Sequence, residues 1–147
     1  CLSKSIEALA RGLKIIKTES GDVLHSIKSS SQGFNGFGEA YFSEVKPNAI
    51  KGWKMHNIMT LNISVPIGKI RFVLFDERSS SDKKFQEVII SKENYFRLTV
   101  PPRVWLAFQG LSKSNSLLLN VANVAHDPKE SVIKDLHEIN FDWSNKK

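Results

Sequence analysis

The strongest constraint on the fold is a series of short apolar segments, which turn residues separate at intervals of roughly 8–12 residues. Several of these segments alternate apolar and polar residues, and this period puts every second side chain on one face of a strand. No amphipathic stretch is long enough for a crossover helix, so a parallel α/β sheet is not expected. The pattern predicts about nine or ten short strands in an all-β sandwich or barrel.

Turn residues set the boundaries of the expected strands. Gly21-Asp22 and Pro47-Asn48 are typical turn pairs, because glycine, asparagine and aspartate tolerate turn backbones and proline presets one. The pair Pro101-Pro102 cannot lie inside a central strand. We expect the strands within residues 13–20, 23–29, 39–45, 49–56, 59–65, 69–77, 85–91, 95–100, 101–111 and 115–124.

The 147 residues are most simply one domain, since that length can bury a sizeable core and no repeat or flexible linker divides it. Residues 1–12 are expected to form a locally helical or extended lead-in. Residues 129–147 are polar, and we expect a C-terminal tail there with at most a short helix.

Composition excludes some classes of function. The net charge of +6 comes from basic residues spread along the chain without a nucleic-acid-binding motif, so a solvated basic surface is expected and no nucleic-acid partner. A positive cleft would favour a phosphate-bearing ligand. No apolar run approaches the roughly 20 residues that span a bilayer, so no membrane partner is expected. The single cysteine, Cys1, excludes an intramolecular disulfide and suits a cytoplasmic location.

The stretch Lys51-Gly52-Trp53-Lys54-Met55-His56 places cationic and titratable side chains on one expected strand. Because strand side chains alternate, Lys54 and His56 point to the same face. If that face is the interior, both reach a pocket; if it is the exterior, both are surface residues. Histidine suits proton transfer near neutral pH, especially when a carboxylate holds it.

The order of short motifs resembles one enzyme family. Lys51-Gly52-Trp53-Lys54, Asp76-Glu77-Arg78 and Val100-Pro101-Pro102-Arg103, followed by an Asp142-Trp143 pair, are similar to the dTDP-4-dehydrorhamnose 3,5-epimerases. The segment ending at His56 also resembles the related sugar 3,4-ketoisomerases. The resemblance covers about residues 13–143 and implies a cupin fold, a double-stranded β-helix or jelly roll.

The resemblance also implies a chemistry, the removal of a carbon-bound proton beside the ketone of a nucleotide-linked 4-keto-6-deoxy sugar. It gives His56 and Lys54 as catalytic candidates. Lys54 would act as a base or as a cation that stabilises the enolate. The resemblance implies Lys51 as a contact to the phosphates and Glu39 as a contact to the nucleotide. Arg71 and His126 are further, weaker substrate-binding candidates.

Several family residues have no counterpart in this chain. The strand that carries the family's catalytic tyrosine reads Ala122 to His126 here, Leu106 replaces a histidine, and the histidine's partner aspartate belongs to an extension beyond these 147 residues. The alternative is therefore a catalytically degenerate cupin that binds a sugar nucleotide or a partner enzyme.

We expect no metal and no cofactor, because Lys54-Met55-His56 supplies one histidine and a protonated lysine repels a cation. The family resemblance implies a homodimer, with Tyr41, Phe42 and the N-terminal strand at the interface.

Overall fold

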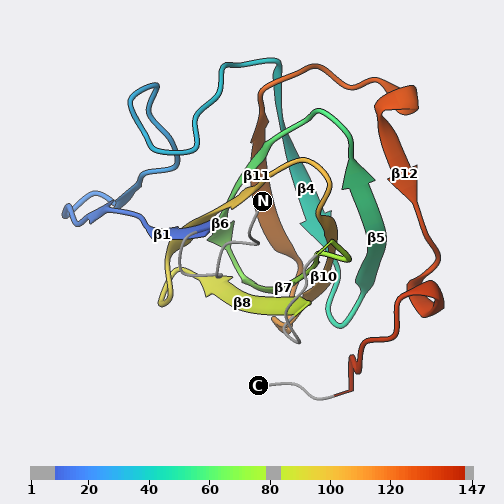
Figure 1. The fold of residues 1–147 in the computed structure, drawn as a ribbon. Helices are drawn as coiled ribbons and strands as arrows, with labels where there is room; N and C mark the ends of the chain where they lie inside the picture. Colours follow the sequence, from blue (N-terminus) through green and yellow to red (C-terminus); the bar gives the residue numbers. More distant parts are fainter. Residues whose placement is uncertain (1–8, 79–83, 145–147) are drawn as a thin grey trace.

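The computed structural model describes residues 9–78 and 84–144, and these ranges form an antiparallel β-sandwich (Figure 1). Two five-stranded sheets pack face to face, and a two-stranded hairpin lies apart from them. The all-β architecture predicted from the spacing of the turns is confirmed. The connection between the strands expected at residues 69–77 and 85–91 includes residues 79–83, which lie outside the described residues.

In sequence order, strands of one sheet are interspersed with strands of the other. Sheet 1 has the order β1 (Ala10–Gly12), β9 (Phe96–Val100), β6 (Leu61–Ile67), β11 (Ser116–Ala122), β4 (Glu39–Val45). Sheet 2 has the order β12 (Ser131–Ile133), β5 (Ile50–His56), β10 (Trp105–Gly110), β7 (Lys69–Phe75), β8 (Phe85–Ser91). The hairpin pairs β2 (Ile15–Ile16) with β3 (Val23–Leu24), on either side of the predicted turn at Gly21-Asp22.

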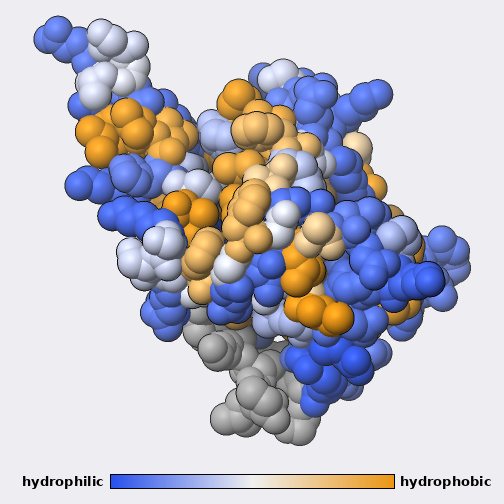
Figure 2. All heavy atoms as spheres, turned by 90° about the horizontal axis from the view of Figure 1, so that it is seen from above, coloured by the Kyte–Doolittle hydropathy of each residue, from blue (hydrophilic) through white to orange (hydrophobic). Residues whose placement is uncertain are grey.

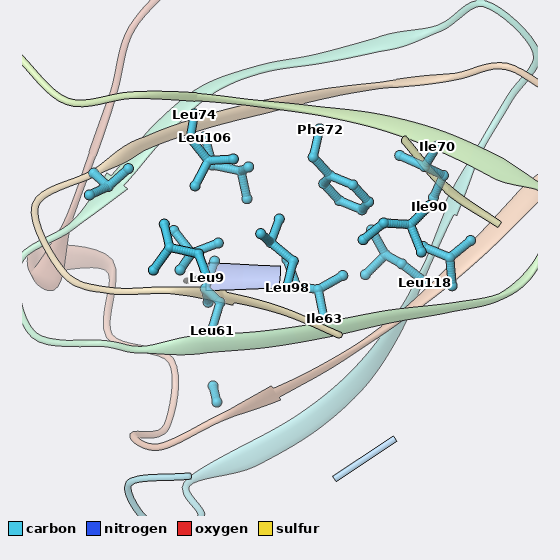
Figure 3. Close-up of a cluster of buried hydrophobic side chains, with 14 of the residues drawn as sticks. Leu9, Leu61, Ile63, Ile70, Phe72, Leu74, Ile90, Leu98, Leu106 and Leu118 are labelled. Atoms are coloured by element: carbon cyan, nitrogen blue, oxygen red, sulfur yellow. The ribbon is translucent and has the colours of Figure 1, made fainter. Parts of the chain in front are cut away.

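The main core lies between the sheets, and Figure 3 shows side chains of both sheets pointing toward one another. Alternation along each strand supplies them, as in β7, where Ile70, Phe72 and Leu74 are at most 2% exposed. Sheet 1 contributes Leu61, Ile63, Leu98 and Leu118 to the same cluster. Burial of these apolar surfaces is the main term that holds the sandwich together.

A second core covers the outer face of sheet 2. The C-terminal segment after β12 crosses this face, and its Ile139, Phe141 and Trp143 pack against Trp53 and Trp105. The indole Nε1 of Trp53 also donates a hydrogen bond to the carbonyl oxygen of Leu136, at 3.2 Å. Apolar residues thus cover both faces of sheet 2 in its central strands.

This arrangement decides one open alternative and corrects two local predictions. Of the two forms expected for the lead-in, helical and extended, Ala10–Gly12 takes the extended one as an edge strand paired with β9, while residues 1–8 lie outside the described residues. Within the expected tail, β12 is a strand paired with β5, and two 3₁₀ turns, Pro128–Glu130 and Leu136–Glu138, flank it. The break between the strands expected at residues 59–65 and 69–77 is confined to Gly68, because Pro66 and Ile67 still belong to β6.

No helix in the described ranges has the length and the apolar character needed to cross a membrane.

Candidate active site

Lys54 and His56 both face the space between the sheets. Lys54 is the cross-strand partner of Leu106 on β10, and Leu106 belongs to the main core. Paired residues of antiparallel strands project to the same face, and residues two apart on a strand do so as well. Trp53 and Met55, which alternate with them, pack in the outer cluster. The side chains of Lys54 and His56 therefore point to the interior, not to the exterior.

A bulge between β5 and β10 brings Lys51 to the same side. Lys51 pairs with Phe108, which packs against the main core, whereas Lys54 pairs with Leu106. The one extra residue of β5 between these pairs changes the alternation. The ammonium of Lys51 donates to the hydroxyl of Ser43 on β4, at 2.7 Å, so it reaches from sheet 2 to the edge of sheet 1.

His56 is paired with a carboxylate that the sequence analysis did not identify. Its Nδ1 lies 2.7 Å from Oε1 of Glu130, and the two side chains are only 10% and 6% exposed. The other oxygen of Glu130 accepts hydrogen bonds from the backbone amides of Ile58 and Met59, both at 2.8 Å. Glu130 is the last residue of the 3₁₀ turn that precedes β12. Because β12 pairs with the end of β5, the Glu130 side chain lies beside that end of the strand.

These contacts favour a charged Glu130. Burial raises the pKa of the Glu130 carboxyl, but the hydrogen bonds from His56, Met59 and Ile58 outweigh burial and hold this pKa below its usual value. A carboxylate can only accept, so Nδ1 of His56 carries the hydrogen of this bond. In the neutral ring the lone pair is then on Nε2, the tautomer of a histidine that acts as a base.

Strand β4 adds polar groups to the interior face. Glu39 pairs with the fully buried Ala122, and its Oε1 accepts from the backbone amide of His126 at 3.1 Å. Tyr41 pairs with Asn120, whose amide Nδ2 donates to the Tyr41 hydroxyl at 3.1 Å. The structure therefore joins Glu39 to the backbone of His126, which is itself an exposed residue.

Arg71 lies elsewhere. It alternates with Ile70 and Phe72 and so projects from the outer face of sheet 2, where it is 1% exposed. Its Nε donates to Glu87 at 2.9 Å, and its guanidinium lies 5.1 Å from the ring centre of Phe141. The structure does not bring Arg71 together with Lys54 and His56.

Sequence reasoning missed Glu130 and assigned Tyr41 only to an interface. Glu130 is separated from His56 by 74 positions, and its role depends on β12 folding back along β5, in a segment expected to be a tail. The inward side of Tyr41 could have been found from the alternation that ends in buried Val45. Among the described residues, no three His, Cys, Asp or Glu side chains gather in a group that could hold a metal ion.

Comparison with known proteins identifies the family. No family model and no curated protein matches this chain. Among solved structures, a dTDP sugar isomerase from Desulfovibrio desulfuricans G20 is 35% identical, with a TM-score of 0.87 over 94% of this chain and 91% of that one.

Two more distant structures share the fold. A dTDP-6-deoxy-D-glucose-3,5-epimerase from Legionella pneumophila Philadelphia 1, in complex with dTDP-4-keto-L-rhamnose, is 21% identical with a TM-score of 0.71 over 82% of this chain and 69% of that one. A 3′-monoepimerase from Streptomyces bikiniensis, in complex with dTDP-quinovose, is 15% identical with a TM-score of 0.74 over 84% and 67%. The protein thus belongs to the cupin family of dTDP-sugar isomerases and epimerases.

Proposed function

We propose that this protein is a metal-independent isomerase or epimerase of a dTDP-linked 4-keto-6-deoxyhexose, acting in surface-polysaccharide synthesis. The observation that carries the proposal is the buried His56–Glu130 pair, with Nδ1 and Oε1 2.7 Å apart, on the inward face of β5. A histidine held by a carboxylate is the usual form of a base that removes a carbon-bound proton near neutral pH.

In the proposed reaction, Nε2 of His56 takes the proton from a carbon beside the sugar ketone. The electron pair of the broken C–H bond forms the enolate, whose negative charge develops on the former carbonyl oxygen. Lys54, on the same face of β5, would stabilise that oxygen. Return of a proton to the opposite face of the same carbon gives an epimer. A proton delivered instead to the former carbonyl carbon completes a keto-isomerisation, provided that the hydroxyl on the deprotonated carbon passes its proton to the former carbonyl oxygen and becomes the new ketone.

The other inward residues have binding and proton-transfer roles in this proposal. Lys51 would contact the diphosphate, and its bond to Ser43 holds the ammonium between β5 and β4. Glu39 and His126, joined by a hydrogen bond, would lie on the substrate side. Tyr41 would donate the returning proton, since its hydroxyl faces inward and Asn120 donates to it.

The relatives support the substrate class. The similar Desulfovibrio protein is a dTDP sugar isomerase, and the Legionella and Streptomyces proteins are in complex with dTDP-4-keto-L-rhamnose and dTDP-quinovose. Cytoplasmic location is proposed with the substrate class, because nucleotide sugars are made and consumed inside the cell.

One observation favours a second candidate, a cupin that binds the sugar nucleotide without turning it over. Glu130 also accepts from the backbone amides of Ile58 and Met59, so the His56–Glu130 pair fastens the end of β5 to the C-terminal segment. A pair with that structural role can persist after the chemistry is lost.

We also propose a homodimer. Phe42 and Ile67, 65% and 57% exposed, project from the outer face of sheet 1. Each is adjacent to an apolar residue of β11, Phe42 to Leu119 and Ile67 to Leu117, so these four residues form a continuous apolar patch. Figure 2, which views the molecule from above Figure 1, shows hydrophobic side chains gathered in a band on the surface turned toward the viewer. Exposed apolar patches are typical of association surfaces.

The decisive experiment is hydrogen–deuterium exchange in D₂O on dTDP-4-keto-6-deoxyglucose, followed by NMR. We expect the protein to exchange the hydrogen at sugar C3 or C5. His56→Asn should abolish the exchange, while His137→Asn, which changes an exposed histidine, should keep it. Ligand binding without exchange by the wild type would support the second candidate, and neither exchange nor binding would reject this substrate class.

A further inference from the structure

A cavity of about 410 Å³ lies on the N-terminal side of the molecule, away from the inward face of β5. Its wall includes part of β1, the segment around the β2–β3 hairpin, residues 25–28 and 31–32, and one residue of β9, Arg97. Arg97 alternates with Leu98, which belongs to the core between the sheets, so Arg97 projects from the opposite, outer face of sheet 1. This cavity and the His56 site are on different sides of sheet 1.

The cavity wall is strongly basic. Its titratable residues are Arg11, Lys14, His25, Lys28 and Arg97, and no carboxylate among the described residues lines it. Arg11 and Arg97 are direct partners in the β1–β9 ladder, so two guanidinium side chains project from adjacent positions on one face.

Arg97 is the buried floor of this cavity. It is 4% exposed, and its two terminal nitrogens donate to the carbonyl oxygens of Ser26 and Gln32, at 3.0 and 2.9 Å. Its Nε is buried and has no hydrogen-bond partner among the residues that the structure describes. Burial, and then the charge of Arg11, hold the pKa of Arg97 below its usual value. Within the described ranges, the hydrogen-bond partners of this buried cation are neutral carbonyl groups, an arrangement that is costly and that an anion would relieve.

We propose that this cavity is a second binding site, separate from the substrate site, for a phosphate or diphosphate group carried by a small molecule. Arg97 and Arg11 would hold the oxyanion, because guanidinium groups match phosphate oxygens in geometry. Lys14 and Lys28 at the exposed rim would add charge attraction. The volume exceeds that of a phosphate group alone, so the site can hold part of the molecule that bears it.

The test is calorimetric titration with inorganic pyrophosphate in about 0.15 M salt, where diffuse surface attraction is largely screened. The site variant is Lys14→Ala/Lys28→Ala, which changes exposed residues and should leave the fold intact. The matched control, Lys113→Ala/Lys129→Ala, removes the same charge from exposed positions that do not line the cavity. We expect wild type and control to bind equally and the site variant to bind at least 10-fold more weakly.

Two further titrations test whether pyrophosphate binds here and not at the substrate site, and whether this site prefers pyrophosphate to another anion. Lys51→Ala, which alters the inward face of β5, should keep pyrophosphate binding at this site. Citrate should bind more weakly than pyrophosphate. The proposal is overturned if pyrophosphate does not bind the wild type, if both lysine pairs weaken it equally, if Lys51→Ala abolishes it, or if citrate binds more tightly. None of these results depends on hydrogen–deuterium exchange at the sugar, so the two proposals fail separately.

Discussion

Nδ1 of His56 and Oε1 of Glu130 lie 2.7 Å apart in a buried pair that joins the last residue of β5 to the residue before β12. The pair therefore links the inward face of sheet 2 to the C-terminal segment. The contribution of this pair to stability and the chemistry proposed for His56 both depend on one carboxylate from the far end of the chain, which makes Glu130 the most informative residue to change.

Replacement of Glu130 by glutamine should make the free energy of unfolding less dependent on pH in the acidic range. The folded-state pKa of Glu130 is held below its unfolded value, so its contribution is present above the unfolded pKa of about 4.3 and is lost as pH falls through the folded pKa. The difference in unfolding free energy between wild type and Glu130→Gln should be largest above about pH 5 and should shrink in more acidic solution. Urea unfolding at a series of pH values measures it. Glu93→Gln, at an exposed position, sets the baseline for losing one carboxylate.

A double-mutant cycle should detect the coupling between the two partners. His56→Ala and Glu130→Ala each leave a buried polar group without its partner, which costs roughly 1–3 kcal/mol. The double variant should be less unstable than the sum of the singles, by a coupling energy of about 1 kcal/mol or more. A coupling energy near zero would mean that the 2.7 Å contact contributes nothing to stability.

The same pair should orient the proposed base. Glu130→Gln replaces a charged acceptor by an amide, so the preferred tautomer of His56 is no longer fixed. We expect at least a 10-fold loss in the rate of hydrogen exchange at the sugar, with sugar-nucleotide binding retained. Loss of binding with an unchanged exchange rate in the bound complex would contradict an orienting role.

Lys51 should act on substrate binding more than on turnover. Its ammonium bonds to Ser43 at the edge of sheet 1, and a charge-assisted bond to a phosphate is worth about 1.5–3 kcal/mol. Lys51→Met should therefore raise KM roughly 10- to 100-fold with little change in kcat. Lys46→Met, in the exposed turn before β5, is the matched control. An equal loss in kcat and kcat/KM would instead place Lys51 in the transition state.

The pattern of strands and turns predicted most of the sandwich, because period-two alternation and turn residues are local signals. The same alternation placed Lys54 and His56 on one face correctly. It could not decide that the face is inward, because that depends on the register with β10. It also missed β12, whose Val132 and Ile133 are exposed, so no buried alternation marks the strand. Glu130 was missed because it is brought close to His56 only when β12 pairs with β5, which no local pattern predicts.

Removal of the Trp53 side chain should release the C-terminal segment. Trp53 is fully buried in the outer cluster, and truncation of such an aromatic residue to alanine costs about 3–5 kcal/mol. Trp53→Ala should lower the unfolding free energy by this amount and should speed proteolytic cleavage within residues 134–144. Val132→Ala, on an exposed face of β12, should do neither. Equal proteolysis of the two variants would mean that the C-terminal segment is not held by Trp53.

A charge on the apolar patch should separate the proposed dimer. Phe42 lies beside Leu119 on the outer face of sheet 1 and is 65% exposed, so lysine there is tolerated in a monomer but would be buried in an interface. We expect Phe42→Lys to shift the molecular mass measured by light scattering from dimer to monomer, without a large loss of thermal stability. Phe37→Lys changes an equally exposed loop residue, and it should leave the dimer intact. If the wild type is itself monomeric, or if both variants dissociate alike, this patch is not the dimer interface.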